Sequence, residues 1–152
     1  TQMKKITLLF ALVAFFAAGS VSAQNTSRLN GKSYWYMMKN ADGTGEEIHD
    51  NIRFTDNVMS SDRAGVVANG KPAKVSEKKI SDESTSFVTS IQSVNGEELR
   101  YDCTVEGNMM VGTVQVKKAD GTVTDMVLRG MSQEEYLRIK KMKDDYQKSN
   151  TK

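Results

Sequence analysis

The chain contains one histidine and one cysteine, so any chemistry that needs either group depends on a single residue. His49 lies beside Asp50 and two residues after Glu47, and with Asp42 these side chains could ligate a metal ion. His49 could also serve as the base of a Ser-His-Asp or Cys-His arrangement. However, the sequence holds no His-x-His or cysteine pair of the kind that metal sites commonly use. We therefore expect His49 to be a solvated surface side chain, and we predict neither a metal site nor a catalytic residue.

Cys103 could act as a thiol nucleophile only in an exposed, electropositive setting. It alternates with Tyr101 and Val105 while polar residues lie between them, so we expect the thiol to be buried. The acidic run 42–47 lacks the spaced ligands of an EF-hand loop and is predicted to be a hairpin turn. No phosphate-binding glycine loop or nucleophile elbow is present. The sequence thus favours a protein without enzymatic activity or a cofactor.

The first 23 residues have the three parts of a secretory signal peptide. Two lysines precede an apolar run over 6–18, and small residues follow over 19–23. The run is too short to span a bilayer, which needs about 20 apolar residues. We expect cleavage between Ala23 and Gln24, a periplasmic or secreted product, and no transmembrane anchor. Because Met3 resembles a natural start, we interpret residues 1–2 as untranslated.

The charge balance of the expected mature chain argues against a nucleic-acid partner. The signal peptide carries two of the 21 basic residues and no acidic residue, which leaves as many basic side chains as the 19 acidic ones. A neutral chain without a basic stripe lacks the electrostatic footprint of a nucleic-acid or anionic-membrane binding protein. We therefore predict no nucleic-acid partner, whereas the identity of any protein partner stays open.

Residues 29–129 show a period-two pattern of apolar side chains with turn signals between the segments, which is typical of an all-β domain. Short glycine-bearing connections predict that sequence neighbours pair antiparallel. We predict a seven- or eight-stranded up-and-down antiparallel barrel within a domain over 24–130, with 61–70 as a loop or a short irregular strand. The predicted strands are 33–39, 48–55, 58–61, 73–76, 84–92, 98–105, 109–117 and 122–129.

The remaining segment, 131–152, is predicted to be a C-terminal α-helix and tail. Ser132 and Glu135 have the spacing of a capping box at the helix start. A narrow apolar stripe then recurs at three- and four-residue spacing. We expect the helix to pack over the barrel wall or across one mouth, with partner binding as the alternative. The stripe consists of Tyr136, Ile139, Met142 and Tyr146.

Strand alternation also predicts which side chains face the interior of the barrel. An eight-stranded barrel is just wide enough to be filled by side chains or to hold one small ligand. Large aromatic and methionine side chains could fill the lumen, whereas Thr89, Gly112 and Cys103 would leave room locally. We expect Trp35 to face outward or lie near a rim. The predicted lumen positions are Tyr34, Tyr36, Met38, Phe54, Phe87, Tyr101, Cys103, Met110, Met126 and Leu128.

Two stretches of the sequence are similar to a known family. Residues 29–34 with 50–61, and later 105–114 through 128–130, resemble small exported bacterial lipocalin-like domains. The likeness covers most of residues 29–130 and includes no catalytic motif. It implies a calycin-type barrel in a family largely without assigned biochemistry.

Three functions remain as hypotheses. The first is an exported, non-enzymatic barrel that binds a small apolar or amphipathic molecule in its lumen. The second is a filled barrel that acts through an apolar patch on its outer surface. A hydrolase that uses His49 or clustered carboxylates is the third. The outer positions considered for the second hypothesis are Trp35, Met37, Val66, Val67, Met109 and Val111.

Overall fold

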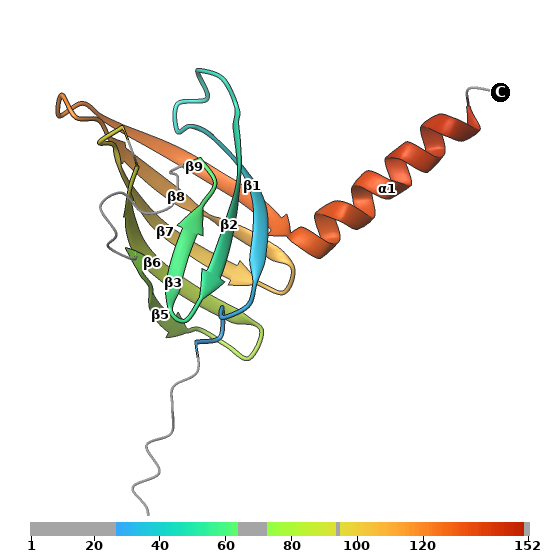
Figure 1. Cartoon of the computed structure of the whole chain (residues 1–152), viewed down its shortest axis with the longest axis horizontal. Coiled ribbons are helices and arrows are strands. Elements are labelled where there is room, and N and C mark those ends of the chain that lie inside the picture. Colours follow the sequence, from blue (N-terminus) through green and yellow to red (C-terminus); the bar gives the residue numbers. More distant parts are fainter. Residues whose placement is uncertain (1–26, 64–72, 94, 151–152) are drawn as a thin grey trace, which may run out of the picture.

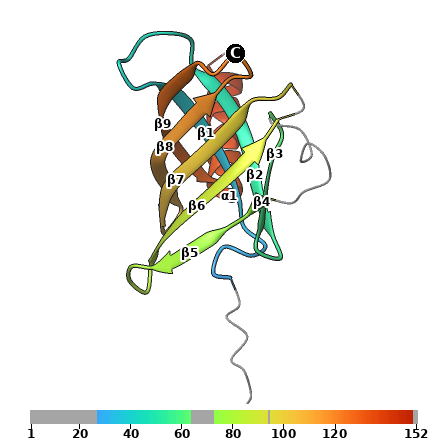
Figure 2. The same ribbon diagram turned by 90° about the vertical axis from the view of Figure 1, so that its left-hand side faces the viewer.

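The computed structural model describes residues 27–63, 73–93 and 95–150, which form a nearly closed antiparallel β-barrel followed by one α-helix (Figure 1). The predicted signal peptide and its cleavage site lie outside the described residues, as does most of the predicted loop 61–70 with Val66 and Val67. The strands form one sheet in the order β4-β3-β2-β1-β9-β8-β7-β6-β5. Figure 2 shows β5 to β9 side by side along one wall.

The period-two pattern predicted the positions of the strands, but the described residues form nine strands rather than seven or eight. All neighbours in the sheet pair antiparallel. The strands are β1 (Ser33–Asn40), β2 (Ile48–Thr55), β3 (Val58–Ser61), β4 (Ala73–Lys74), β5 (Ser76–Lys79), β6 (Ser84–Gln92), β7 (Glu98–Glu106), β8 (Met109–Lys117) and β9 (Val123–Ser132).

The additional strand arises because the predicted segment 73–76 changes partner at Val75. Before this residue β4 pairs with β3, and after it β5 pairs with β6. The backbone N–H of Val75 donates to the carbonyl oxygen of Asn57 (2.9 Å). The hydroxyl of Thr89 in β6 donates to the backbone carbonyl oxygen of Lys74 in β4 (2.8 Å). These contacts draw the two ends of the sheet together, which nearly closes the barrel.

The tight turn between β2 and β3 formed as predicted. Asp56 and Asn57 have φ values of 50° and 62°, the left-handed conformation that a two-residue hairpin requires and that these residue types tolerate. Thr55 and Val58 pair directly across this turn. The turn therefore fixes the register that directs Ile52 and Phe54 into the interior.

The interior contains the side chains that strand alternation predicted. All ten predicted lumen positions are at most 5% exposed. The segment before β1 closes one end of the barrel, where Leu29 is fully buried. Its position is fixed by backbone hydrogen bonds from Gly31 to Phe54 (2.8 Å) and from Phe54 to Lys32 (2.9 Å). Leu29 thus joins the strand side chains in one continuous core.

The C-terminal helix α1 (Gln133–Ser149) begins as predicted at Ser132, whose hydroxyl accepts from the backbone N–H of Glu135 (3.3 Å). The capping box is only half formed. The Glu135 carboxylate pairs with Arg138 (2.6 Å), and the Ser132 N–H donates to the carbonyl oxygen of Asn108 (2.8 Å). Ser132 thus caps the first turn of the helix, but the Glu135 carboxylate does not accept the Ser132 N–H in return.

The expectation that α1 packs on the barrel wall or across a mouth is wrong. No residue of α1 is buried, and Figure 1 shows the helix projecting away from the barrel. The reason is that β9 ends at Ser132 and α1 begins at Gln133, so no loop allows the helix to fold back. In the part of the chain that the structure describes, no helix is both long and apolar enough to cross a membrane.

Candidate functional site

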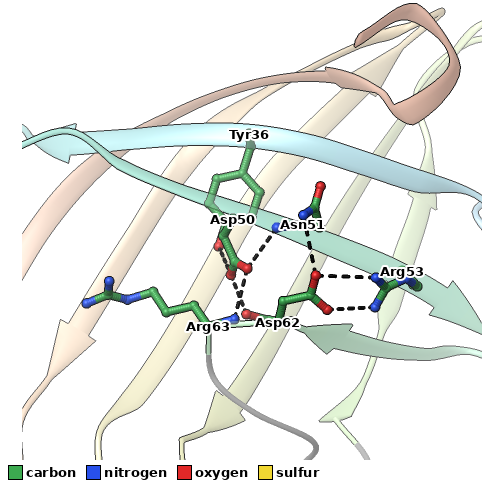
Figure 3. A network of polar contacts seen from close by, with 7 residues as sticks. Tyr36, Asp50, Asn51, Arg53, Asp62 and Arg63 are labelled. Carbon is green, nitrogen blue, oxygen red and sulfur yellow. Dashed lines mark hydrogen bonds and ion pairs between the residues drawn. The ribbon is translucent and has the colours of Figure 1, made fainter. Parts of the chain in front are cut away.

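A polar network lies inside the barrel, centred on Asp50 of β2. The Tyr36 hydroxyl donates to Asp50 Oδ2 (2.9 Å) and lies 3.0 Å from the Tyr101 hydroxyl. The Ser61 hydroxyl also donates to Oδ2, and Oδ1 accepts the backbone N–H groups of Asn51 (2.7 Å) and Arg63 (2.9 Å). Figure 3 shows the Tyr36 ring directed from β1 toward the carboxylate. The network thus joins strands β1, β2, β3 and β7.

These hydrogen bonds explain how the barrel can contain a carboxylate that is only 5% exposed. A buried charged group is costly unless hydrogen bonds replace its water, and Asp50 receives four donors. The strand register places Tyr36 directly opposite Asp50 in the β1–β2 pair. Strand alternation from Phe54 through Ile52 also directs residue 50 inward, so the sequence contains a signal for a buried Asp50.

The electrostatics of the network favour a structural role over proton transfer. Burial, followed by the proximity of Tyr101 and Asp50, raises the pKa of Tyr36 far above its usual range. Burial also raises the pKa of Tyr101 to about 12. Both phenols therefore stay protonated at neutral pH and can donate hydrogen bonds to or within the network.

Aromatic side chains from separate walls meet inside the barrel. Phe54 of β2 and Phe87 of β6 contact edge to face with ring centroids 5.1 Å apart, and Tyr34 lies 6.2 Å from Phe54. Tyr36 of β1 meets Tyr101 of β7 with centroids 6.3 Å apart, although β9 and β8 separate these strands in the sheet. These contacts span the lumen where a ligand was expected.

The expectation that Gly112 and Cys103 leave free space is wrong. A Cβ atom on Gly112 would lie 2.6 Å from both Cα and Sγ of Cys103, so the cysteine already occupies this space. Gly112 therefore permits a close approach of β8 to β7. Cys103 is buried as predicted, and burial raises the pKa of its thiol to about 12. Such a thiol is poorly suited to act as a nucleophile.

The candidate metal ligands do not converge in the structure. His49 is exposed, and its Nε2 lies 3.0 Å from Glu47 Oε1. The carboxylate of Asp42 turns back instead to accept the backbone N–H of Thr44 (2.8 Å). Among the residues with described positions, no group of three or more His, Cys, Asp and Glu side chains could hold a metal ion.

An aromatic stack lies on the outside of the barrel, where the helix begins. The Trp35 ring stacks on Tyr136 of α1, with centroids 4.7 Å apart and an interplanar angle of 11°. His49 stacks on Trp35 at 5.2 Å and 28°. Trp35 faces outward as predicted, because it alternates with the buried residues Tyr34 and Tyr36. This stack connects the first turn of the helix to the barrel.

Apolar side chains continue from the stack across the outer faces of β1, β9 and β8. The register places Met131 between Trp35 and Met109 in one row, and Arg129 between Met37 and Val111 in the next. Met109 and Val111 are 50% and 49% exposed. We call the set Trp35, Met37, Met109, Val111, Met131 and Tyr136 the outer apolar patch.

The sequence predicted Trp35, Met37, Met109 and Val111 as outer positions and Tyr136 as part of the helical stripe. It did not predict Met131, which lies beyond the predicted end of its strand at residue 129. The actual β9 runs three residues further, to Ser132, and thereby places Met131 between Trp35 and Met109. Arg129 was not predicted, because a single charged residue on an outer face gives no periodic signal.

Comparison of the chain with protein-family models, curated proteins and solved structures found no match.

Proposed function

We propose that this chain is an exported, non-enzymatic interaction module, in which a barrel filled by its own side chains binds a protein partner through the outer apolar patch. The observation that carries the proposal is the exposed patch at the junction of barrel and helix. Large apolar side chains that are half exposed in adjacent rows often mark a protein-binding surface.

The composition of the patch supports a protein partner in particular. Tryptophan, tyrosine, methionine and arginine are enriched in protein interfaces. Here Trp35 is braced by two stacked rings, so it can be buried by a partner with little loss of side-chain freedom. A preorganised aromatic side chain at one end of an apolar row, next to Met131, can serve as an interface anchor.

The charge within the patch indicates the chemistry of the partner. Arg129 is exposed between Met37 and Val111, and no carboxylate of the described residues forms an ion pair with it. A guanidinium group surrounded by apolar side chains favours a carboxylate at the same place on the partner. The proposed partner is therefore a protein surface with apolar side chains around an Asp or Glu.

The interior contacts favour this function over luminal binding of a small molecule. A ligand in the lumen would have to displace the Phe54–Phe87 contact or separate the Tyr36 and Tyr101 hydroxyls. The second change would also remove support from the buried Asp50 carboxylate. The patch requires no such rearrangement, because its side chains already lie at the surface, where Met109 and Val111 are exposed and the others are half-buried.

Export and kinship with lipocalin-like domains are part of the proposal. The arrangement of residues 3–23 supports export, and the nearly closed antiparallel barrel with its C-terminal helix is compatible with a lipocalin-like fold. A partner would then be met in the periplasm or outside the cell.

Site-specific photo-crosslinking in the source cells tests the proposal. A photoreactive residue replacing Val111 is expected to give a discrete adduct with one other protein. The same residue at Ser90, which is exposed on the outer face of β6, is the control and should give no such adduct. Arg129→Glu should reduce the Val111 adduct about tenfold, because it places like charges against each other.

Any of three outcomes of the crosslinking comparison would overturn the proposal, as would one outcome of the adduct mass. These are the absence of an adduct at Val111, an equal adduct at Ser90, or an adduct that Arg129→Glu leaves unchanged. An adduct with the mass of two copies of this chain would also contradict it, because the occupant would then be a second copy. Circular dichroism of each variant establishes that the barrel is intact.

A further inference from the structure

Beyond partner binding at the barrel, the helix α1 presents a second apolar surface. Ile139, Met142 and Tyr146 share one face, and Met142 and Tyr146 are 59% and 70% exposed. A groove along this face is lined by these three residues together with Arg138, Lys143 and Gln147. We call Ile139, Met142 and Tyr146 the helix stripe.

We propose that α1 pairs with α1 of a second copy in antiparallel orientation through the helix stripe. The three side chains of the stripe follow one another along the helix with the three- and four-residue spacing of positions a and d in a heptad. The stripe is therefore a single row of apolar side chains. So narrow a stripe matches a coiled-coil seam, whereas a membrane-binding helix or a helix lying on a core presents a broader apolar face.

Beyond its first turn, the helix has no stabilising tertiary contact with the other residues that the structure describes. None of its residues is buried, and the described contact with the barrel is the stack of Tyr136 on Trp35. Most helices in proteins are stabilised by packing of an amphipathic face rather than by intrinsic propensity alone. A second copy would supply that packing to both helices at once.

The charges beside the stripe specify the orientation. Arg138 and Asp145 are seven residues apart, so both flank the same side of the stripe. The Arg138 Nε and Nη2 atoms pair with Glu135 of the same helix, whereas its Nη1 atom lies 3.5 Å from Met142 Sδ, beside the stripe. In an antiparallel pair each Arg138 meets Asp145 of the other helix, which gives two reciprocal ion pairs. In a parallel pair Arg138 would instead approach Lys143 across the seam, which is repulsive.

The shape of the molecule allows this arrangement. Figure 1 shows α1 extending freely from the barrel, and a 17-residue helix is about 25 Å long. Antiparallel pairing therefore places the two barrels at opposite ends of the helix pair, where they do not collide. Because the seam contains three apolar side chains from each copy, we expect a weak dimer that dissociates on dilution.

Sedimentation velocity of the purified chain over a range of concentrations tests this inference. The expected mass rises with concentration from that of one chain to that of two. Met142→Glu should keep the chain monomeric over the same range. Leu137→Glu is the matched control, because Leu137 is 53% exposed on the opposite side of the helix and should not affect the dimer.

Charge reversal tests the orientation. Arg138→Asp or Asp145→Arg alone should weaken the dimer about tenfold, because two attractive pairs become repulsive. The double variant with both changes should restore the dimer, since each pair is again of opposite charge. A monomer at every concentration, or equal effects of Met142→Glu and Leu137→Glu, would overturn the inference.

If both single variants weaken the dimer and the double variant does not restore it, the antiparallel orientation is overturned. The dimer test does not depend on the partner proposed for the outer apolar patch, because Met142→Glu should leave the Val111 adduct unchanged. If the chain forms the dimer but gives no Val111 adduct, only the proposed function is overturned.

Discussion

Tyr36 and Tyr101 meet inside the barrel with their hydroxyl oxygens 3.0 Å apart, although two strands separate β1 from β7 in the sheet. Through Tyr36 this contact continues to the buried carboxylate of Asp50 on β2. The interior is therefore braced by a specific polar contact in addition to apolar packing. Because this contact and the Phe54–Phe87 contact cross the lumen, a ligand there would have to displace them, whereas a partner on the outer surface would not.

Replacing Tyr36 by phenylalanine should destabilise the barrel. The change removes one donor from Asp50 and the partner of the Tyr101 hydroxyl, so we expect the free energy of unfolding to fall by about 1–3 kcal/mol. Urea titration followed by circular dichroism measures this change. Tyr34→Phe is the control: no described residue forms a hydrogen bond with that hydroxyl, and the effect should stay within about 0.5 kcal/mol. Equal effects of the two variants would refute a structural role for the network.

The buried Tyr101 and Cys103 predict a loss of stability at alkaline pH. Burial raises the pKa of Tyr101 from 10.0 to about 12 and that of Cys103 from 9.0 to about 12. Between the ordinary and raised values only the unfolded chain releases these protons, so the free energy of unfolding decreases as pH rises. Each group contributes about 1.4 kcal/mol per pH unit in that interval. Urea midpoints measured from pH 8 to pH 12 should therefore fall, and a flat profile above pH 10 would contradict this prediction.

A methyl group at Gly112 should strongly destabilise the fold. The added Cβ would overlap the backbone and thiol of Cys103 at 2.6 Å, and the backbone cannot move away without disturbing the β7–β8 ladder. We expect Gly112→Ala to lower the free energy of unfolding by about 3 kcal/mol. Thr113→Ala, at the exposed neighbouring position, should change it by less than about 0.5 kcal/mol. Thermal unfolding of both variants measures these changes. A similar stability of Gly112→Ala and Thr113→Ala would contradict the prediction, because it would show that the structure has room for a methyl group at residue 112.

Much of the barrel could be predicted from the sequence because period-two alternation is a local signal. The strand positions and the ten buried lumen positions followed from it, as did the Asp56–Asn57 turn. The additional strand at Val75 could not be predicted, since a change of partner depends on both ends of the sheet meeting. Asp50 was missed for a different reason, namely that a charged residue is not expected in a core although its position in the alternation was clear.

The helix shows where local patterns stop being informative. Ser132 and the stripe predicted the start of α1 correctly, but neither contains information on the direction in which the helix leaves the barrel. That direction follows from the absence of a loop after β9. The outer apolar patch was likewise only partly predictable, because Met131 joins it through the register of β9 with β1 and β8.

The single tryptophan offers a direct test of the junction between helix and barrel. Removing the stacked ring by Tyr136→Ala should expose more of Trp35 and shift its fluorescence emission to longer wavelength. Leu137→Ala alters the adjacent residue, which lies on the exposed side of the helix, and should leave the emission unchanged. Identical spectra for the wild type and both variants would show that Tyr136 does not cover Trp35 in solution.

The most direct test of the central claim is native mass spectrometry of the protein purified gently from its own source. A barrel filled by its own side chains should appear as the bare chain, alone or in complexes whose additional mass is that of whole protein chains. A small molecule that remains bound under native conditions and is released on denaturation would contradict the claim, because the lumen would then be a binding site.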